Sequence, residues 1–522
     1  MTARDDSLER LRTREPWDML VIGGGATGLG AALDATTRGY RTLLLESHDF
    51  AQGTSSRSTK LVHGGVRYLE RGEVGLVREA LRERGRLLRN APHLVHARAF
   101  LVPAYHMGQR LFYGAGLWLY DRLAGKLGLG RTRMVGREES LRLLPTLEPD
   151  RLRGGVVYQD GQFDDARLAV TLARTIADHG GLALTGVGVI ALSRSPVGRI
   201  DGVTAIDRET GETFRIPARV VVNATGVWGD EVRRMDEPEA APILTTSQGA
   251  HVVLDRAFLP GETALMVPKT DDGRVLFAIP WCGRVLVGTT DTPVSTVSNA
   301  PRALPEEVDF LLRHAARYLT RDPGPADVRA VFAGLRPLIV PPRKEHAATA
   351  KLSREHATFV SRSGLVTITG GKWTTYRRMG ETVVDLAARV AGLPPRPCVT
   401  ADLRLHGWTE IPADGPLAKY GADAPAVASL LAEQPGWNEP LHPRLPDLAG
   451  EVAWSARFES ARTVDDFLAR RSRALFLDAR AAADMAPRVA AILAFELGRD
   501  EAWCEREVDA FRTLACGYVL TS

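Results

Sequence analysis

Cysteine is scarce in this chain of 522 residues, and long apolar runs are missing. The cysteines are Cys282, Cys398, Cys504 and Cys516, and they form neither a C-x-x-C pair nor a Cys/His spacing typical of a metal site. We therefore expect a reducing compartment and no structural metal. No stretch of about 18 uncharged apolar residues is present, which argues against a conventional membrane-spanning helix but leaves attachment to a membrane surface open.

Signals for disorder and for secretion are also missing. There is no long Ser, Gln or Pro tract, and a composition of 44% hydrophobic and 25% charged residues is typical of a globular protein. The first residues, MTARDDSLERLRTREPWD, carry mixed charge without an apolar segment, so we expect no secretory signal and a cytoplasmic location. A chain of this length exceeds one compact core, which predicts two or three domains.

The net charge is only +4, but basic residues are concentrated in one region. Residues 51–100 contain ten Lys and Arg against four Glu. A region of this kind can bind nucleic acid, an anionic substrate or anionic lipid. Nucleic acid is disfavoured, because the basic excess is confined to this region and lacks interleaved aromatic residues for base stacking.

The segment DMLVIGGGATGLGAALDATTRGYRTLLLES, residues 18–47, predicts a strand, a glycine turn, a helix and a second strand. Gly23, Gly25 and Gly28 match G-x-G-x-x-G: they permit a tight turn, close approach of a pyrophosphate, and packing of helix on strand. Glu46 ends the second strand, where it can accept hydrogen bonds from a ribose, and an acid here argues against a 2′-phosphate. The segment predicts a dinucleotide site but does not separate NAD from FAD.

Two later segments favour FAD. RVVVNATGVWGD, residues 219–230, and GLVTITGGKWTTYRRMGE, residues 364–381, each contain a β-run that ends in glycine. Such strands recurring late in the chain indicate that distant segments return to one long cofactor. An NAD domain is usually one contiguous half of the chain.

The remaining patterns predict the domain organisation. Residues 1–395 are expected to form a discontinuous FAD-dependent oxidoreductase region, with a β-rich substrate domain mainly in residues 235–340. Prolines in and next to residues 396–415, together with the mixed polarity of this segment, predict a linker there. Beyond them, apolar residues at three and four spacing predict a small helical C-terminal domain over residues 416–522.

Five motifs, in this order, carry a family resemblance: GTSSRSTKLVHGGVRYLE, GAHVVL, IPWCGRVLVGTTDT, AGLRPL and TGGKWTTYR. Together they resemble the FAD-dependent glycerol-3-phosphate dehydrogenase family, and DFLARRSR resembles that family's C-terminal domain. The resemblance implies an α/β fold with a Rossmann-type, glutathione-reductase-like FAD domain, a β-rich substrate domain and a helical C-terminal domain. It implies oxidation of sn-glycerol 3-phosphate to dihydroxyacetone phosphate, with FAD reduced and the electrons passed to a membrane quinone. The expected partners are glycerol 3-phosphate, a quinone and the inner face of the cell membrane, and a homodimer is a further expectation.

Small residues after Glu46 are candidates for contact with the flavin, because they let backbone N–H groups approach a flat ring. For the glycine pair at residues 64–65, the alternative is a plain turn without a cofactor contact. Lys372, between a Gly-Gly turn and a helix start, can stabilise negative charge on the reduced flavin, with an exposed lysine as the alternative. His63 is assigned no proton transfer. The residues assigned to FAD are Gly23, Gly25, Ala26, Thr27, Gly28, Glu46, Thr54, Ser55, Ser56, Lys60, Leu61, His63, Gly64, Gly65, Gly371, Lys372 and Thr374.

Oxidation of a secondary alcohol requires a base for the hydroxyl proton and fixed positive charge for the phosphate. His251, in the strand GAHVVLD, is the candidate base, and a buried core histidine is the alternative. Arg binds phosphate oxygens in pairs. The substrate-binding candidates are Arg67, Tyr68, Thr290 (or Thr289), Arg336 and Arg354. Arg336 is the strongest of them, whereas Arg354 could equally be a solvated surface residue. The residues assigned to catalysis are His251, Arg336 and Lys372.

Membrane contact is predicted by two neighbouring features. Arg78, Arg82, Arg86 and Arg89 recur at four, four and three spacing on an expected helix, and LFYGAGLWLY, residues 111–120, is too short to span but suits interfacial insertion. The alternative to membrane contact is that the arginines form a solvated helix face and that residues 111–120 belong to a core helix. An oxygen-dependent oxidase and an amine or amino-acid oxidase remain alternatives to the dehydrogenase.

Overall fold

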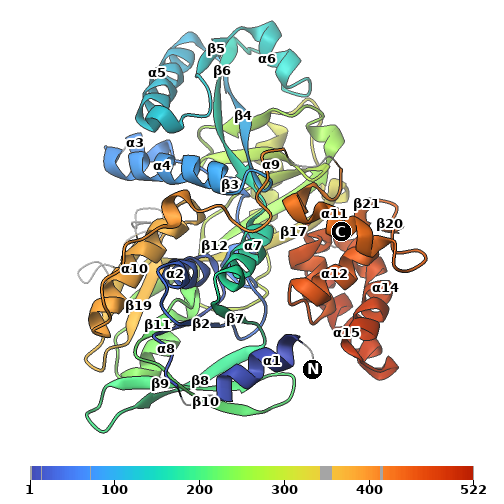
Figure 1. Ribbon diagram of the computed structural model, residues 1–522. Coiled ribbons are helices and arrows are strands. Elements are labelled where there is room, and N and C mark those ends of the chain that lie inside the picture. Colours follow the sequence, from blue (N-terminus) through green and yellow to red (C-terminus); the bar gives the residue numbers. More distant parts are fainter. Residues whose placement is uncertain (1–2, 13–14, 71, 341–355, 412–414, 521–522) are drawn as a thin grey trace.

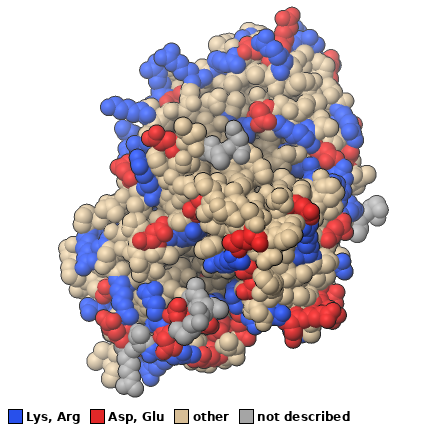
Figure 2. Space-filling model, turned by 45° about the vertical axis from the view of Figure 1, so that its right-hand side comes forward, with Lys and Arg blue, Asp and Glu red and all other residues tan. Residues whose placement is uncertain are grey.

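The computed structural model describes residues 3–12, 15–70, 72–340, 356–411 and 415–520. Figure 1 shows a largely parallel sheet in the lower half, a larger mixed sheet above it and a group of helices from the C-terminal part at the right. Figure 2 shows Lys and Arg side chains interspersed with Asp and Glu over the face it displays.

The lower sheet is built from short, buried apolar strands, as expected where helices cover both faces of a parallel sheet. Two of its inner strands read MLVI and TLLL, and every residue in them is buried. Neighbouring strands are parallel except for an antiparallel strand at one edge. Within the described residues its order is β18 (His356–Val360), β19 (Val366–Gly370), β11 (Val221–Asn223), β1 (Met19–Ile22), β2 (Thr42–Leu45) and β7 (Leu182–Leu184).

Helices α2 (Ala26–Thr37) and α10 (Tyr376–Val390) pack together against this sheet although they are far apart in sequence. Their contact depends on small residues, because a Cβ on Gly30 would lie 2.7 Å from the Tyr376 carbonyl oxygen and a Cβ on Gly380 would lie 2.4 Å from that of Gly30. Late segments of the chain therefore complete the cofactor domain. A small antiparallel sheet lies at its edge, formed by β8 (Val187–Arg194), β9 (Ile200–Asp207) and β10 (Thr213–Pro217), near α1 (Ala3–Glu9).

The upper sheet draws on more of the chain than the range 235–340 expected for the substrate domain. Strands from residues 61–163 join it because β4 pairs in parallel with β13, Phe100 opposite Ala264, and in antiparallel with β6. Its described strands, in order, are β16 (Thr292–Val294), β12 (Leu244–Asp255), β15 (Arg284–Gly288), β14 (Leu276–Trp281), β13 (Ala264–Val267), β4 (Val95–Ala104), β6 (Gly154–Phe163) and β3 (Leu61–Val62), with β17 (Val328–Ile339) on β12 and β5 (Arg133–Val135) on β6.

Six further helices connect or cover these sheets. One of them, α7, begins with an aspartate cap, because the Asp164 carboxylate accepts hydrogen bonds from the backbone N–H groups of Ala166 and Arg167. None of the helices in the described part of the chain is both long and apolar enough to cross a bilayer. These helices are α4 (Val74–Asn90), α5 (Met107–Ala124), α6 (Arg137–Leu143), α7 (Asp165–Asp178), α8 (Gly229–Asp236) and α9 (Pro305–Ala316), and a single turn, α3 (Arg67–Glu70), precedes them.

The C-terminal part is mainly helical and packs on the upper sheet. Phe467 and Phe476 are buried in one apolar cluster with Val253 and Phe332 of the sheet. Full burial of one such side chain contributes about 1.5–3 kcal/mol, so this contact holds the two parts together. The elements are η10 (Ala418–Asp423), α11 (Ala424–Leu431), β20 (Pro440–His442), β21 (Leu445–Leu448), α12 (Gly450–Phe458), η11 (Asp466–Arg471), α13 (Ala474–Leu477), α14 (Ala479–Leu497) and α15 (Glu501–Cys516).

Buried ion pairs attach the C-terminal helices to the cofactor domain. Both terminal nitrogens of Arg471 donate to the Asp49 carboxylate at 2.8 Å, and Arg470 pairs with the same carboxylate. Arg167 of α7 donates to both oxygens of Glu459 at 2.7 and 2.9 Å. Charges of this kind are stable in a dry interior only when they are paired. The attachment therefore requires both partners of each pair.

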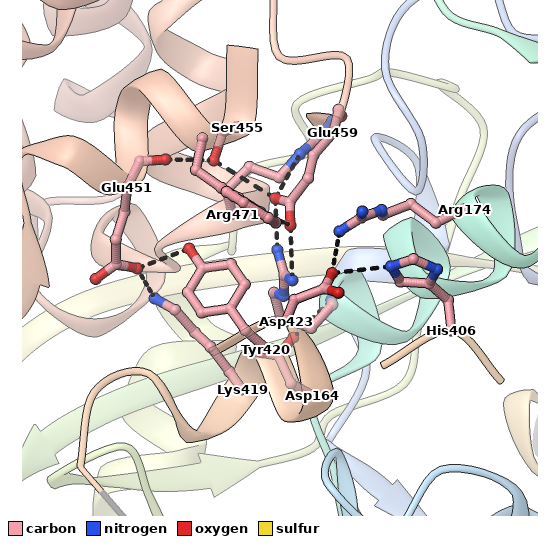
Figure 3. Close-up of polar contacts among 12 residues, drawn as sticks. Asp164, Arg174, His406, Lys419, Tyr420, Asp423, Glu451, Ser455, Glu459 and Arg471 are labelled. Carbon is pink, nitrogen blue, oxygen red and sulfur yellow. Dashed lines mark hydrogen bonds and ion pairs between the residues drawn. The ribbon is translucent and has the colours of Figure 1, made fainter. Parts of the chain in front are cut away.

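A second polar network joins the segment after residue 396 to α7 and η10 (Figure 3). The His406 ring bridges two carboxylates, with Nδ1 2.7 Å from Asp178 and Nε2 2.8 Å from Asp423, while Arg174 also pairs with Asp423. Burial acts to lower the pKa of His406, but its hydrogen bonds to Asp423 and Asp178 outweigh burial and raise that pKa above its ordinary value. The neighbouring His93 has its pKa lowered to about 4, mainly by burial.

The raised pKa of His406 predicts a pH-dependent attachment of this segment. A group with a raised folded-state pKa contributes stability fully below its unfolded pKa of about 6.5 and loses it as the pH rises through the folded value. We expect the variant His406→Gln to lose less stability than the wild type as the pH rises above 6.5, in thermal unfolding followed across pH. The exposed His179→Gln serves as the control, and parallel pH profiles for wild type and His406→Gln would contradict the expectation.

Candidate active site

A cavity of about 660 Å³ lies between the two sheets and is lined by residues of both. One end is formed by Gly23, Gly25 and Glu46, and the other by His251 and Arg336. This volume is in the range of ligand and cofactor sites. The cavity therefore connects the glycine motif of the cofactor domain with the candidate base and phosphate residues of the upper sheet.

The glycine motif lies at the N-terminus of α2, where backbone N–H groups suit a pyrophosphate. The Ala26 N–H donates to the Ser55 hydroxyl at 2.9 Å, which joins the loop after β2 to this turn. Gly23 has φ +109°, a conformation that favours glycine. A Cβ on Gly28 would lie 1.9 Å from the Gly23 carbonyl oxygen, so this position packs the helix on the turn and does not itself line the cavity.

The variant Gly28→Ala is therefore expected to lose bound cofactor. The added methyl group must displace the Gly23 carbonyl and with it the turn that faces the phosphates. Flavin absorbance per protein should fall at least tenfold, or the protein should not fold, because the overlap is with backbone that cannot rotate away. Gly75→Ala in α4 is the matched control, since a Cβ there meets nothing within 4 Å. Retention of full cofactor by Gly28→Ala would contradict this account.

Glu46 is placed and held by the backbone. Its Oε2 accepts from the Gly24 N–H at 2.6 Å and its Oε1 from the His48 N–H at 2.9 Å. Burial raises the pKa of Glu46 above its ordinary value, although these two hydrogen bonds act to lower it. Each carboxylate oxygen accepts more than one hydrogen bond, so both can still accept from ribose hydroxyls.

The middle of the cavity brings two distant segments together, residues 55–68 and residues 372–374. The Trp373 indole N–H donates to the Ser55 carbonyl at 2.8 Å, and the His63 N–H donates to the Thr374 hydroxyl at 3.2 Å. The Lys372 ammonium lies 4.0 Å from the centre of the Tyr68 ring, a distance suited to a cation–π contact. These contacts leave the lysine at the wall of the cavity, as a flavin contact requires. The backbone cradle and the charge present fit a flavin dinucleotide.

Most of the residues assigned to FAD line this cavity, and four do not. Ser56 is buried, and its carbonyl accepts from Lys60 and from Arg473. Gly64 packs against Leu81 and Tyr120, where a Cβ would lie 2.7 to 2.8 Å from their side chains. The residues that line it are Gly23, Gly25, Ala26, Thr27, Glu46, Thr54, Ser55, Leu61, His63, Gly65, Gly371, Lys372 and Thr374, and the others are Gly28, Ser56, Lys60 and Gly64.

The Lys60 side chain, assigned to FAD from the sequence, lies outside the cavity lining. Its side chain is fully buried below the cavity wall, where the ammonium donates to Asp165 at 2.7 Å and to the Ser56 carbonyl at 2.8 Å. Burial lowers the pKa of Lys60 to about 7, against the opposing charge of Asp165. A buried ammonium needs such a carboxylate, and Asp165 supplies it outside the cavity lining. Arg473 pairs with the same aspartate at 3.0 Å.

His251 lies at the substrate end and is nearly fully buried. Its ring stacks on Phe332 with centres 4.8 Å apart, and its Nε2 is 3.0 Å from the Thr59 hydroxyl. Its Nδ1 is buried without a hydrogen-bond partner among the described residues. Burial, followed by the charges of Lys60 and Arg336, holds the pKa of His251 well below its ordinary value. The imidazole is therefore neutral at neutral pH and able to accept a proton.

Arg336 lies beside His251, and protein acceptors hold both of its terminal nitrogens. The guanidinium crosses Gly249, where a Cβ would lie 2.1 Å from it, so only glycine permits this position. Its hydrogen bonds are from Nη1 to the Gln248 carbonyl (3.3 Å) and Asp291 (3.1 Å), and from Nη2 to the Thr289 hydroxyl (3.1 Å) and the Thr290 carbonyl (3.0 Å).

The remaining substrate candidates differ in their outcome. The Thr290 hydroxyl donates to Glu307 at 2.7 Å and accepts from the Ala250 N–H at 2.8 Å, so its proton is not offered to the cavity. Tyr68 lines the cavity. Arg67 begins α3, but its side chain is outside the described part of the structure, and Arg354 lies outside the described residues.

Three charged residues at or below this end were missed in the sequence. Asp291 follows the quoted GTT sequence and pairs with Arg336, and Arg274 precedes the strand that carries the IPW motif; both line the cavity. Asp165 pairs with Lys60. Asp291 could have been recognised as a site residue because it lies inside the IPWCGRVLVGTTDT motif. For Arg274 and Asp165, the sequence offers no indication beyond their charge.

Comparison with known families agrees with this arrangement. A family model described as FAD dependent oxidoreductase matches residues 18–377, and one described as C-terminal domain of alpha-glycerophosphate oxidase matches residues 362–504. Among curated proteins, the mitochondrial glycerol-3-phosphate dehydrogenase of Arabidopsis thaliana is 40% identical, covering 97% of this chain and 87% of its own. The human mitochondrial glycerol-3-phosphate dehydrogenase is 37% identical, covering 98% of this chain and 74% of its own.

Solved structures give the same picture. The glycerol-3-phosphate dehydrogenase from Bacillus halodurans, complexed with FAD, aligns with a TM-score of 0.81 at 31% identity, over 99% of this chain and 97% of that one. The glycine oxidase from Geobacillus kaustophilus aligns over 74% of this chain and 98% of its own, with a TM-score of 0.53 at 19% identity, and shares the fold alone. The predicted fold class is confirmed.

Proposed function

Because the chain belongs to the FAD-dependent glycerol-3-phosphate dehydrogenase family, with FAD as its cofactor, we propose that it oxidises sn-glycerol 3-phosphate to dihydroxyacetone phosphate and passes the electrons to a membrane quinone. The observation that carries the proposal is the cavity that joins the dinucleotide motif to His251 and Arg336. The glycerol 3-phosphate named for the relatives suits this end, because a neutral base and fixed positive charge stand next to each other there.

In the proposed function, Gly23, Gly25 and the start of α2 would hold the pyrophosphate of FAD, Glu46 would hold a ribose, and Lys372 would lie against the flavin. Bound FAD supplies the acceptor for the hydride that leaves C2 of the substrate. Where bound cofactor and substrate displace water from the cavity, charge interactions in the site become stronger.

His251 takes the proton of the C2 hydroxyl in this proposal. Its low pKa keeps it neutral and ready to accept the proton, and the stack on Phe332 fixes the direction of the ring. Arg336, held by its four acceptors, keeps a positive charge beside the oxygen from which the proton leaves.

The acceptor is tested by comparing two products during turnover with glycerol 3-phosphate. In air, the purified protein is expected to form much less than one peroxide per substrate oxidised and to reduce a soluble quinone analogue stoichiometrically. One peroxide per substrate, with no quinone reduction, would replace the dehydrogenase by an oxygen-dependent oxidase. The quinone, the membrane and the homodimer stay predictions.

The membrane part of the proposal rests on α5, at the top of Figure 1. Leu111, Phe112 and Trp118 are 58%, 63% and 54% exposed, and their separations of one, six and seven residues place them on the same side of the helix or beside it. Arg78 and Arg82 of the adjacent α4 are exposed. An apolar helix face beside basic residues suits the surface of an anionic membrane, here the inner face of the cell membrane.

The double variant Phe112→Ser/Trp118→Ser is expected to bind vesicles of anionic phospholipid at least about tenfold more weakly, because burying one large apolar side chain contributes about 1.5–3 kcal/mol. Cosedimentation measures the partitioning. Phe495→Ser in α14 is the matched control, because this phenylalanine is 69% exposed on a different part of the molecule. Equal binding by the double variant and the control would remove α5 from the membrane contact.

A further inference from the structure

Arg274 is a largely buried cation in the cavity whose guanidinium makes no hydrogen bond within the described part of the chain. It lies between β13 and β14, its side chain is 20% exposed, and its Nε is fully buried without a hydrogen-bond partner among the described residues. The nearest carboxylates are Asp272, 3.4 Å from Nε, and Asp291, 3.8 Å from Nη2. Buried charged groups are normally hydrogen-bonded, so this guanidinium points to an anion that the cavity receives.

Arg336 differs from Arg274 in this respect. The hydrogens of its two terminal nitrogens already point at protein carbonyls, a hydroxyl and a carboxylate. To bind a phosphate with its planar fork, Arg336 would have to release two of these acceptors. Its position next to His251 instead makes it a fixed charge, and this charge helps to lower the pKa of His251.

Asp291 connects the two arginines. One of its oxygens is 3.1 Å from Arg336 and the other is 3.8 Å from Arg274, and its side chain is 5% exposed. One buried carboxylate between two guanidinium groups leaves a positive balance on the cavity side. Asp272 does not cancel it, because its side chain is 34% exposed and its charge is therefore screened by solvent.

We propose that Arg274 binds the phosphate group of the substrate and selects for it, with Asp291 positioning both arginines. This rests on the proposed function. Electrostatic interactions join His251 to Arg336, Arg336 to Asp291 and Asp291 to Arg274 in that order. Glycerol 3-phosphate has a matching order: the reacting C2, then C3, then the ester oxygen and phosphorus. Arg274 offers a planar fork that makes no hydrogen bond within the described part of the chain, and a planar fork is what bidentate phosphate recognition requires.

The test compares Arg274→Gln with Arg317→Gln. Arg317 pairs with Asp271 in the same β13–β14 connection but does not line the cavity, so its variant controls for loosening of this loop. Two experiments are made on the FAD-loaded proteins. Steady-state kinetics give KM and kcat for glycerol 3-phosphate, and a titration with inorganic phosphate gives its Kd from the perturbation of the flavin absorbance.

Arg274→Gln is expected to raise KM and the phosphate Kd by about 10- to 150-fold, the range for loss of hydrogen bonds to a charged group, with a much smaller change in kcat. Arg274→Lys, which keeps the charge but not the fork, should fall between Arg274→Gln and wild type. Values for Arg274→Gln that match those for Arg317→Gln would overturn the proposal. A wild-type protein that is not reduced by glycerol 3-phosphate would overturn the proposed function instead, and the phosphate titration would still decide the role of Arg274 because it needs no turnover.

Discussion

Replacing His251 by Asn is expected to lower kcat for glycerol 3-phosphate oxidation by about 10²–10⁴-fold, the usual contribution of a positioned base. The neutral imidazole beside Arg336 is the group in the described cavity that is poised to accept the hydroxyl proton. Asn fits the same space and keeps a polar group near the Thr59 hydroxyl, but it cannot take up a proton.

The measurement is the rate of flavin bleaching after anaerobic mixing with substrate, which separates the chemical step from electron transfer to the acceptor. Flavin content of His251→Asn should equal that of the wild type. His93→Asn is the matched control, because His93 is also largely buried with its pKa lowered, to about 4, but lies outside the cavity. A bleaching rate for His251→Asn close to that of the control would assign the proton to another group.

Replacing Arg167 by Met is expected to reduce the free energy of unfolding by about 3–5 kcal/mol, the cost of leaving one charge of a buried pair alone. Arg167 and Glu459 are almost fully buried, and the pKa of Glu459 is held at about 2 by Arg167 against the opposing effect of burial. Without Arg167, the Glu459 carboxylate must remain charged in a dry environment or take up a proton. Urea titration measures the change.

The double variant Arg167→Met/Glu459→Gln is expected to recover much of this loss, because it removes the unpaired charge. Arg313→Met is the control for an exposed pair: Arg313 and Asp309 are 54% and 65% exposed, and the change should stay within about 1 kcal/mol. If Arg167→Met were as stable as Arg313→Met, the buried pair would not be what holds the C-terminal helices to α7.

The parts of the fold that were predicted from sequence are those encoded locally. The glycine motif, the acid at Glu46 and the buried strands around them lie in one short segment, and each residue type has one physical reason to be there. The late strand before Gly370 was assigned to the same domain because its apolar run ends in glycine, and it pairs with β11 in the lower sheet. Local pattern was enough in both cases.

The extent of the upper sheet was not predictable in this way. The pairing of Phe100 with Ala264 joins strands far apart in sequence, and nothing in either strand specifies its partner. The same limit applies to side-chain partners. Lys60 lies in a segment of small residues that line the cavity, but its side chain pairs with Asp165 of α7, which is far away in the sequence. Thr290 likewise gives its proton to Glu307 of α9.

Arg274 was missed for a related reason. In the sequence it follows two aspartates in a polar turn, which is typical of an exposed hairpin. Its burial and its approach to Asp291 arise only when β14 and β15 pack beside β12. Charge alone did not separate it from the other arginines of the chain.

Anaerobic reduction of the purified protein by sn-glycerol 3-phosphate tests the central claim most directly. The account predicts a yellow protein whose flavin absorbance is bleached on addition of this substrate, with one dihydroxyacetone phosphate formed for each FAD reduced. A protein that binds FAD but keeps its full oxidised spectrum with excess substrate, while dithionite still bleaches it, would contradict the account.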